Sequence, residues 1–584
     1  MNKYIIAFFF VLGSIILTAQ SKELKSIDSL LDLCVKNNCF NGDILIAQNN
    51  FTFYKKTIGY RNNVTQEKLK ANSLFNIASI SKPFTAVAIL QLQEQKLLNI
   101  NDKVVKYLPD FPYTDVCINH LLSHTSGLIA NIDFLKEEDN QKSITNDSIV
   151  SLLIKYKPNL EFKSGEQWGY SNLGYDILAV VVEQVSNLKF DEYMQKNVFR
   201  PAGMSRTFIP RTVNVSSWLT NNLKESDVAL PHNYENLTSC NVRNIYPIVC
   251  SSKQYYYGSS NVYTTVYDLE KFNKALTNNI ILSKESQALA YTPYKLNNGN
   301  FATDTLAPIK SYYGLGWNIS IDTTYGKIIW HKGRSGGTRA VFLRNVDRNQ
   351  IVTFLDNNDN WNTDLKAVAC LKIINHFPYK NPLKKSLVQK FGCEVTSIGF
   401  KKASKEFLKL KETESQNYFI SSDEMNELVL ILDNKGKLQD ALSVSQLANE
   451  LFPNDWSTLL SLGDLQLKNN AITEAIVNYT KSIRLYSDVE DEQISLLGAI
   501  GSQFIEANRL NDAEIVLKLN TEIFPNDCNS YDNYAFILDK NNKLDQAISV
   551  QKKAVALAKE QNHKLLKPLE ENLEKLTVKK STNR

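Results

Sequence analysis

Residues 75–82 read Phe-Asn-Ile-Ala-Ser-Ile-Ser-Lys, and Pro83 and the largely apolar run Phe84–Leu98 follow them. The run predicts a nearly buried helix that starts just after Pro83. Ser79 then lies at the start of this helix, where backbone N–H groups and the helix dipole favour developing negative charge. Lys82, one helical turn on, faces the same side and can accept the serine proton if burial lowers its pKa. The stretch therefore predicts an activated serine at a helix start.

A serine followed three positions later by a lysine is not a specific signal by itself. The same spacing occurs at Ser186 and Lys189 and again at Ser549 and Lys552. Only the copy at Ser79 precedes a long apolar helix that would bury its lysine. An ordinary helix-start serine with an exposed lysine is the alternative, so other segments must decide between the two interpretations.

Two later segments carry side chains that suit the same chemistry. In Tyr170-Ser171-Asn172, a tyrosine beside a lysine can act as a general base or a proton relay, and the asparagine can orient the lysine or bind a substrate amide. Residues 331–337 read His-Lys-Gly-Arg-Ser-Gly-Gly. A glycine at a strand edge lets a substrate backbone approach and places an amide N–H against a developing oxyanion. The structural alternatives are a turn before a helix cap and a glycine-rich hairpin turn.

Around these segments the chain alternates between helical and strand patterns. The predicted elements are a helix over Leu24–Val35, a hairpin of Asp43–Ala47 and Phe51–Ile58 joined at Asn49-Asn50, a helix over Tyr175–Val185, and a strand pair over Lys327–His331 and Thr338–Leu343. An early hairpin, central helices and late strands predict an α+β fold for residues 22–378. We expect an antiparallel sheet flanked by helices, with a helical subdomain beside it.

The chain is 584 residues long, too long for one ordinary domain. Hydrophobic residues make up 43% and charged residues 22%, which is typical of a folded protein with a sizeable core. The net charge of +5 is small and dispersed, so no nucleic-acid surface is indicated. These values predict a multidomain globular protein.

The first 20 residues predict a secretory signal peptide. Lys3 is followed by an apolar run over residues 5–17 and a small-residue exit at 18–21. A membrane anchor would need about 20 apolar residues, so an uncleaved anchor is the weaker interpretation. We expect a mature protein that is periplasmic or secreted and has no stable membrane span.

The C-terminal quarter repeats itself. Ala441, Ala475, Ala513 and Ala547 are separated by 34, 38 and 34 residues, and Phe-Pro-Asn-Asp recurs in the same phase at 452–455 and 524–527. This pattern resembles a tetratricopeptide array, whose period is about 34 residues. It predicts an all-α helical repeat array over 422–575, with a lysine-rich linker at 379–421 before it and a tail at 576–584 after it. A generic helical bundle is the alternative.

Taken together, the motifs of residues 25–378 resemble the serine β-lactamase and penicillin-binding-protein superfamily, most closely its class C-like branch of esterases and D-amino-acid-specific peptidases. Six blocks occur in the family's order, namely Phe75–Lys82, His120–Leu128, Tyr170–Asn172, Gly258 with Tyr263–Leu269, Tyr313–Trp317 and His331–Gly337. The resemblance implies a β-lactamase-like fold.

The resemblance also assigns roles. It implies that Ser79 is the acylated nucleophile, that Lys82 and Tyr170 share acid and base duty, and that Asn172 helps hold the substrate. The backbone N–H groups of Ser79 and Arg334 would form the oxyanion hole, with Gly333 giving the substrate access. The family's third motif commonly begins with a lysine that grips the β-lactam carboxylate, whereas this chain has His331 there. The departure implies that β-lactam hydrolysis is doubtful.

Two other enzymatic interpretations are weaker. Residues 333–337 match the Gly-x-Ser-x-Gly nucleophile elbow, but that motif needs a helix straight after the serine, and Thr338–Leu343 is strand-like. His120 and His124 are spaced like a zinc pair, but no glutamate follows the first histidine and residues 125–127 break the helix. We expect neither a metal nor an organic cofactor.

The sequence therefore predicts an exported serine hydrolase that forms an acyl-enzyme with an ester or amide, favouring a D-amino-acid peptide or a small ester. The alternative is a catalytically silent hydrolase fold whose repeats recruit a protein or peptide partner.

Overall fold

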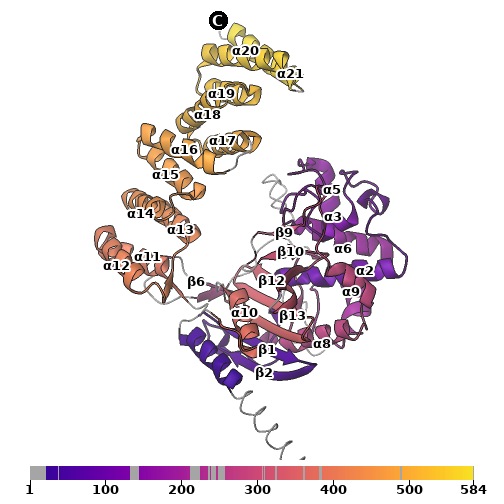
Figure 1. Cartoon of the computed structure of the whole chain (residues 1–584). Coiled ribbons are helices and arrows are strands. Elements are labelled where there is room, and N and C mark those ends of the chain that lie inside the picture. Colours follow the sequence, from indigo (N-terminus) through magenta and orange to yellow (C-terminus); the bar gives the residue numbers. More distant parts are fainter. Residues whose placement is uncertain are drawn as a thin grey trace, which may run out of the picture. The chain divides into compact units, whose positions relative to one another are not determined.

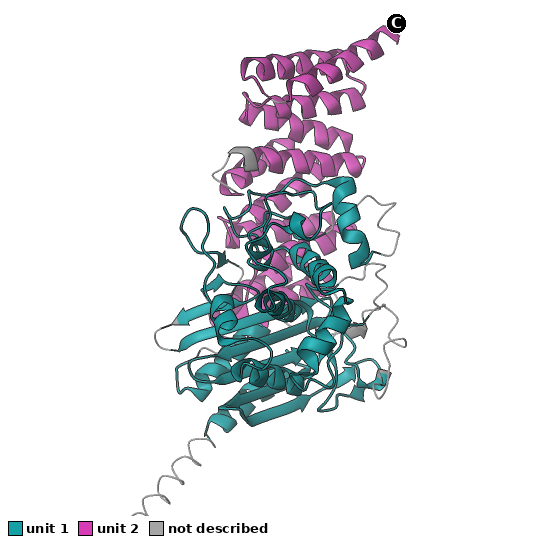
Figure 2. Cartoon of the chain, turned by 90° about the vertical axis from the view of Figure 1, so that its right-hand side faces the viewer, with its two compact units in different colours: residues 1–235, 243–383 teal, residues 236–242, 384–584 magenta. Residues whose placement is uncertain are grey.

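The computed structural model describes residues 22–36, 39–131, 144–210, 224–234, 237–238, 245–247, 257–305, 307, 310–322, 325–358, 362–379, 384–486, 490–563 and 565–582. The chain divides into two compact units, residues 1–235 with 243–383 and residues 236–242 with 384–584 (Figure 2). The predicted signal peptide and the segment 248–256 lie outside the described residues. Along the described part of the chain, we find no helix with the length and apolar character needed to cross a membrane.

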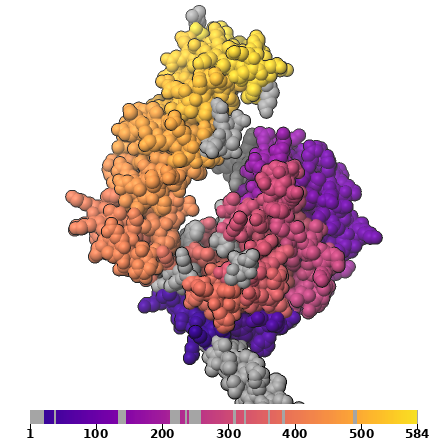
Figure 3. Space-filling view, in the orientation of Figure 1, coloured from indigo at the N-terminus to yellow at the C-terminus, as the bar shows by residue number. Residues whose placement is uncertain are grey.

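The first unit is built on an eight-stranded antiparallel sheet with the order β2-β1-β14-β13-β12-β11-β10-β9. Its strands are β1 (Gly42–Gln48), β2 (Phe51–Ile58), β9 (Thr303–Asp304), β10 (Ser311–Tyr313), β11 (Asn318–Asp322), β12 (Gly326–Ser335), β13 (Thr338–Asn345) and β14 (Gln350–Asp356). Gly42 of β1 lies opposite Asp356 of β14, so the beginning and end of the unit pair. Figure 3 shows the indigo N-terminal part of this unit against its orange-red C-terminal part.

Each central strand buries both of its faces. In β1, Leu45 and Ala47 belong to one hydrophobic cluster, while Ile44 and Ile46 belong to another. Successive side chains of a strand point to opposite faces, so an uninterrupted apolar run requires a covering layer on each side. The sheet is thus the middle layer of three.

A helix over residues 22–36 and α10 (Thr363–Ile374) cover one face, and Figure 1 shows α10 lying against the strands. The other face carries a larger helical region, made of α2 (Ser81–Glu94), α3 (Ile118–Leu122), α5 (Asn146–Tyr156), α6 (Asn172–Ser186), α7 (Phe190–Met194), α8 (Val266–Thr277) and α9 (Lys284–Ala290). This arrangement confirms the predicted α+β class.

Short elements complete the first unit. They are the strands β3 (Tyr60–Asn62), β4 (Glu67–Lys68), β5 (Phe75–Asn76), β6 (His232–Tyr234), β7 (Ile245–Pro247) and β8 (Tyr263–Thr264), and the helical turns η1 (Ala78–Ile80), η2 (Val104–Lys106), η3 (Gln195–Phe199) and η5 (Glu225–Asp227).

Most of the predicted elements are present, with one shifted. Asn49 and Asn50 both have positive φ, at 51° and 65°, which is the conformation of a two-residue hairpin turn. The helix predicted over Phe84–Leu98 instead spans Ser81–Glu94. Proline is tolerated in a first helical turn, whose N–H groups have no intrahelical partner, so the helix begins before Pro83. It stops early because Lys96 is left-handed, with φ 60°.

The second unit is all-helical in its described residues apart from the two-residue strands β15 (Lys385–Ser386) and β16 (Tyr418–Phe419). Its helices are α11 (Leu387–Ile398), α12 (Phe400–Thr413), α13 (Ser422–Asn434), α14 (Leu438–Leu451), α15 (Trp456–Lys468), α16 (Ile472–Tyr486), α17 (Glu490–Glu506), α18 (Leu510–Ile523), α19 (Cys528–Lys540), α20 (Leu544–Glu560) and α21 (Leu566–Thr582). Each of the four periodic alanines is fully buried. The tetratricopeptide assignment itself stays a prediction.

Two expectations about this unit need correction. The stretch predicted as a linker over 379–421 carries α11 and α12, whose apolar faces join the same core as α13 and α14. The predicted tail over 576–584 overlaps α21, which continues to Thr582 and buries Leu576. In both cases the lysines on the exposed side of the helix made the apolar periodicity hard to recognise in the sequence. Long charged side chains can line one side of a helix whose other side is buried.

Candidate active site

Ser79 lies in η1, a single helical turn between β5 and α2. Ala78 has φ 45°, a left-handed conformation that costs a residue with a Cβ about 1–3 kcal/mol. The Oδ1 atom of Asn76 accepts a hydrogen bond from the Ala78 N–H at 2.8 Å and holds this turn. Ala78 and Ile80 are buried, whereas Ser79 is half-buried. Of the three side chains in this strained turn, that of Ser79 is therefore the accessible one.

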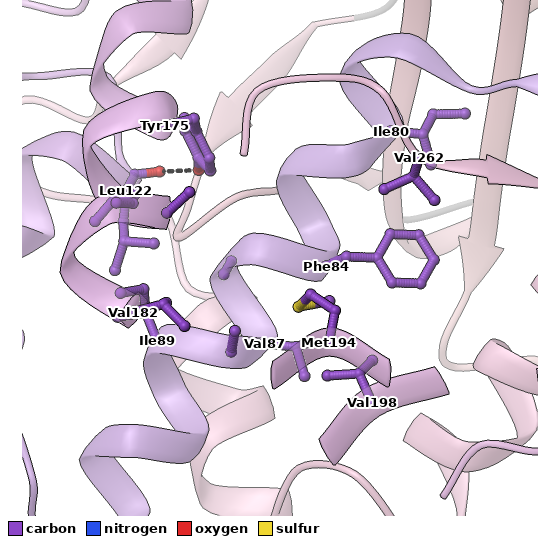
Figure 4. Close-up of a cluster of buried hydrophobic side chains, with 14 of the residues drawn as sticks. Ile80, Phe84, Val87, Ile89, Leu122, Tyr175, Val182, Met194, Val198 and Val262 are labelled. Carbon is purple, nitrogen blue, oxygen red and sulfur yellow. Dashed lines mark hydrogen bonds between the residues drawn. The ribbon is translucent and has the colours of Figure 1, made fainter. Parts of the chain in front are cut away.

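The helix behind Ser79 is anchored in the larger hydrophobic cluster. Figure 4 shows Phe84, Val87 and Ile89 of α2 among apolar side chains of α6, α7 and η3. In the same view the Oη atom of Tyr175 donates a hydrogen bond to the carbonyl oxygen of Leu122 at 2.6 Å, which joins α6 to α3. Close packing of this kind has few alternative arrangements, so the relative position of these helices is set by the core.

Lys82 is completely buried, and three oxygens surround its ammonium group. Its Nζ atom donates to Ser79 Oγ at 3.1 Å, to Asn172 Oδ1 at 2.7 Å and to the carbonyl oxygen of Ser259 at 3.1 Å. Burial disfavours the charged form and lowers the pKa of Lys82 well below that of an exposed lysine. A lysine in this state can accept a proton from Ser79.

Tyr170 completes the group around the serine. Its hydroxyl shares a hydrogen bond with the side chain of Ser79, and the Nζ atom of Lys82 lies 4.7 Å from the centre of its ring. Burial raises the pKa of Tyr170 above its ordinary value, so the phenol keeps its proton at neutral pH. Of the two roles open from the sequence, this favours a proton relay over a phenolate base.

Asn172 is the first residue of α6 and bridges the site to the segment before α5. Its Oδ1 atom accepts from Lys82, and its Nδ2 atom donates to Asn131 Oδ1 at 2.9 Å. Ser171, which caps α6, donates its hydroxyl to the carbonyl of Ile129 and accepts from the N–H of Gly174. The amide of Asn172 is therefore oriented by its neighbours, with its oxygen toward the lysine.

The strand β12 brings the third motif to the same place. Its pairing with β11 ends at Trp330 opposite Asn318, so residues 331–335 extend past that neighbour. A Cβ on Gly333 would lie 2.1 Å from the carbonyl oxygen of Ile77, which precedes η1. Only glycine allows this approach of the strand to the turn that carries Ser79.

His331 is 2% exposed and lies on the same face of the strand as Gly333. Its Nδ1 atom is 2.7 Å from the carbonyl oxygen of Lys332, and its Nε2 atom is 3.1 Å from the hydroxyl of Tyr313. Burial lowers the pKa of His331 to about 3, so the ring is neutral. It donates from Nδ1 to the carbonyl and accepts from Tyr313 at Nε2.

The two cations of this motif point elsewhere. Lys332 alternates with its neighbours to the opposite face, where its Nζ atom lies 3.5 Å from Asp364 of α10. Arg334 has the same parity as Lys332, and its side chain is exposed. The role that the resemblance implies for Arg334 concerns its backbone N–H.

Two buried residues near Lys82 were missed as functional candidates. His124 has φ 58°, accepts from the N–H of Ser171 at 3.1 Å, and places its ring 4.3 Å from that of Tyr170. Asp176, one turn after Asn172, is 2% exposed, and burial raises the pKa of its carboxyl group. The resemblance placed His124 in the block His120–Leu128 but could not show its contacts, and Asp176 left no signal of its own.

The two weaker interpretations of the sequence concern His120 with His124 and the serine at position 335. His120 accepts from the N–H of Cys117 at the start of α3, whereas His124 accepts from the N–H of Ser171. Within the described ranges, no cluster of three or more metal-ligating side chains is found. Ser335 ends β12 and Thr338 begins β13 after a two-residue turn, so the nucleophile-elbow interpretation is wrong: no helix follows that serine.

With this geometry established, comparison with known proteins identifies the family. The beta-lactamase family model matches residues 37–370, more than half of the chain. The chain belongs to the beta-lactamase family. It is 31% identical over 371 residues to penicillin-binding protein 4* of Bacillus subtilis (strain 168), covering 62% of this chain and 78% of the relative. The predicted superfamily is confirmed.

Solved structures of the beta-lactamase fold agree with the first unit. The octameric penicillin-binding protein homologue from Pyrococcus abyssi has a TM-score of 0.52 and 23% identity, over 62% of this chain and 78% of that one. A D-amino acid amidase from Ochrobactrum anthropi SV3 has a TM-score of 0.50 and 16% identity, over 60% of this chain and 98% of that one. At these identities the likeness concerns the fold.

Proposed function

We propose that this protein is a serine hydrolase that forms an acyl-enzyme at Ser79. The observation that carries the proposal is the hydrogen bond from the fully buried Nζ atom of Lys82 to Ser79 Oγ. A buried lysine with a lowered pKa is a base, and the serine beside it is half-buried in a strained turn. Membership of a family of serine hydrolases supports the same assignment.

The reaction follows from these positions. Neutral Lys82 takes the Oγ proton as Ser79 Oγ bonds to the substrate carbonyl carbon, and the electron pair of the carbonyl moves to its oxygen. Backbone N–H groups of Ser79 and Arg334 stabilise this oxyanion. The carbon then releases the leaving group, which receives the proton from Lys82 through the hydroxyl of Tyr170. Water repeats the sequence on the acyl-enzyme, releases the acid and restores Ser79.

The substrate we propose is a D-amino-acid-containing peptide or a small ester. His331 is neutral and Lys332 pairs with Asp364, so neither supplies a fixed charge for a carboxylate beside Ser79. Gly333 lets the edge of β12 approach the turn that carries Ser79, which places this strand edge beside the nucleophile. We therefore expect β-lactam hydrolysis to be slow, because the usual charged anchor for the carboxylate is absent from these two positions.

We further propose that the protein is exported and acts in the periplasm or outside the cell. This rests on the apolar run over residues 5–17, which follows Lys3 and precedes small residues at 18–21. The C-terminal helices would then present a surface to a protein or peptide partner, as tetratricopeptide arrays do.

The test is intact mass of the purified protein after treatment with a fluorophosphonate, in which Ser79 Oγ bonds to phosphorus and fluoride leaves. We expect one adduct on the wild type and none on Ser79→Ala. Pre-incubation with benzylpenicillin then asks whether the pocket accepts a β-lactam, which would block the adduct. Turnover of p-nitrophenyl butyrate and of a D-alanine amide compares the two substrate classes.

The outcomes separate the two functions. An adduct that persists on Ser79→Ala moves the nucleophile elsewhere. A wild type that is neither labelled nor active on either substrate supports the silent scaffold. In that case capture of a partner by the full chain, unchanged in Ser79→Ala, becomes the decisive measurement.

A further inference from the structure

Behind Lys82 lies a carboxylate that the proposed reaction does not use. The Oδ1 atom of Asp176 accepts a hydrogen bond from the backbone N–H of Ser259 at 3.1 Å, and the Ser259 hydroxyl also bonds to the carboxylate. The carbonyl of the same Ser259 accepts from Lys82 Nζ at 3.1 Å. Ser259 is thus held between the carboxylate and the ammonium group, and all three residues are at least 98% buried.

The segment that carries Ser259 is fixed on its other sides. The amide of Asn146 donates to the carbonyl of Tyr257 and accepts from its N–H, both at 2.8 Å. Thr85 Oγ1 donates to the carbonyl of Gly258 at 2.7 Å. Gly258 has φ 110°, and a Cβ there would lie 2.3 Å from a carbonyl oxygen of α6. The Ser259 carbonyl therefore cannot turn away from Lys82 without disturbing this packing.

Asp176 is also the one carboxylate, among described residues, with an electrostatic effect on Lys82. The other titratable side chains around the ammonium group are Tyr170, Tyr175, His124, His331 and Tyr313. Burial lowers the pKa of both histidines and raises the pKa of the three phenols, so all five are neutral near pH 7. Burial also raises the pKa of Asp176, whereas the hydrogen bonds from Ser259 and the charge of Lys82 lower it, so protonation of Lys82 favours the ionised carboxylate.

We propose that Asp176 is a positioning residue for Lys82: its carboxylate seats Ser259 and supplies the negative charge that stabilises the lysine once it has taken the Ser79 proton. The inference rests on the proposed function, since it concerns the same reaction. Asp176 does not touch the substrate. Its effect should accordingly appear in the rate and the pH profile rather than in substrate binding.

The isosteric change Asp176→Asn tests the charge. Without the carboxylate, the ammonium form of Lys82 loses its stabilising partner, so the pKa of Lys82 falls further below its ordinary value. The ascending limb of kcat/KM against pH should move to lower pH by roughly one unit, and the plateau should fall by about ten- to a hundredfold. KM should stay within about twofold, because no substrate contact is removed.

Thr85→Val is the matched control. It removes the hydrogen bond to Gly258 without changing any charge. The plateau of kcat/KM should therefore fall, while the ascending limb of kcat/KM against pH keeps its position. Identical limbs for the wild type and Asp176→Asn would overturn the proposal, as would a change confined to KM.

A second measurement does not depend on activity. Thermal unfolding of Lys82→Met, Asp176→Asn and the double variant at pH 8 should give non-additive shifts of the midpoint, because each single change leaves the other group without its partner. Additive shifts would overturn the pairing. If the wild type is not labelled at Ser79, the proposed function is wrong and Asp176 has no catalytic role. The unfolding measurements still show, independently of activity, whether Lys82 and Asp176 interact.

Discussion

The Nζ atom of Lys82 lies 2.7 Å from the Oδ1 atom of Asn172, a residue 90 positions further along the chain. The bond joins the first turn of α2 to the first residue of α6. Both helices are anchored in one hydrophobic cluster, so their ends are held at this distance by the core rather than by the bond alone. The active-site geometry therefore depends on how the apolar faces of two distant segments pack.

Ser79 and Ser81 are predicted to differ sharply. Ser81 Oγ is buried and accepts from the N–H of Val262 at 3.1 Å, away from Lys82 Nζ. Ser79→Ala should lower ester hydrolysis by roughly ten-thousand-fold or more while the fold persists. Ser81→Ala should keep most of the activity and cost about 1–3 kcal/mol of stability, since it leaves a buried N–H without a partner. Hydrolysis assays and urea unfolding on both variants check this, and the reverse pattern would move the nucleophile to Ser81.

The rate should rise with pH as Lys82 loses its proton. Burial places this loss well below the value of about 10.4 for an exposed lysine. His331, with its pKa lowered to about 3, stays neutral and should not add a limb between pH 5 and 9. Labelling rates of the wild type over this range check the prediction. A rate independent of pH would mean that Lys82 is not the base.

Stability should also depend on the protonation of Lys82. The folded-state pKa is depressed, so between that pKa and about 10.4 the unfolded chain binds more protons than the folded one. Stability therefore increases as pH rises through this window. Lys82→Met should remove that increment. The measurement is urea unfolding of both proteins at pH 7 and pH 9, and an equal pH dependence in the two would contradict the assignment.

Gly333→Ala should separate the strand from the nucleophile turn. Its new Cβ would lie 2.1 Å from the carbonyl oxygen of Ile77, so either β12 or η1 must move. We expect a loss of about 1–3 kcal/mol and a fall in kcat of roughly a hundredfold. Gly498→Ala in α17 is the control, since its new Cβ would lie 3.7 Å from its nearest neighbour, the side chain of Asn533, and alanine favours helix by about 0.5–1 kcal/mol. Full activity in Gly333→Ala would show that close approach of this strand is not needed.

Removal of the helical unit should spare the chemistry. Every predicted site residue belongs to the first unit. Thr238 belongs to the second unit, where its carbonyl accepts from Thr396 Oγ1 at 3.1 Å and its hydroxyl accepts from Lys435 Nζ at 2.7 Å. A chain ending at residue 383 should lose the stability supplied by these contacts yet still be labelled at Ser79. Lys435→Met in the full chain controls for the loss of one bond, and a folded but unlabelled truncation would give the helical unit a part in catalysis.

Local patterns were sufficient for the architecture. The strand-like runs of β1 and β2, the Asn49-Asn50 turn and the apolar run after Ser79 depend on neighbours in sequence, so they could be predicted without distances. The helix boundaries of α2 and the helices α11 and α12 were misjudged. Proline position and surface lysines are ambiguous signals until packing shows which face of a helix is buried.

The sequence by itself determined the fold class, the pairing of Ser79 with Lys82 on one helical turn, and the segments that carry Tyr170 and Gly333. Only the tertiary structure decided which groups carry charge, where Lys332 points, and that Asp176 lies behind Lys82. Spacing within a helix or strand is a property of the local backbone. Burial, and with it pKa, depends on which distant segments surround a side chain, and no local pattern records that.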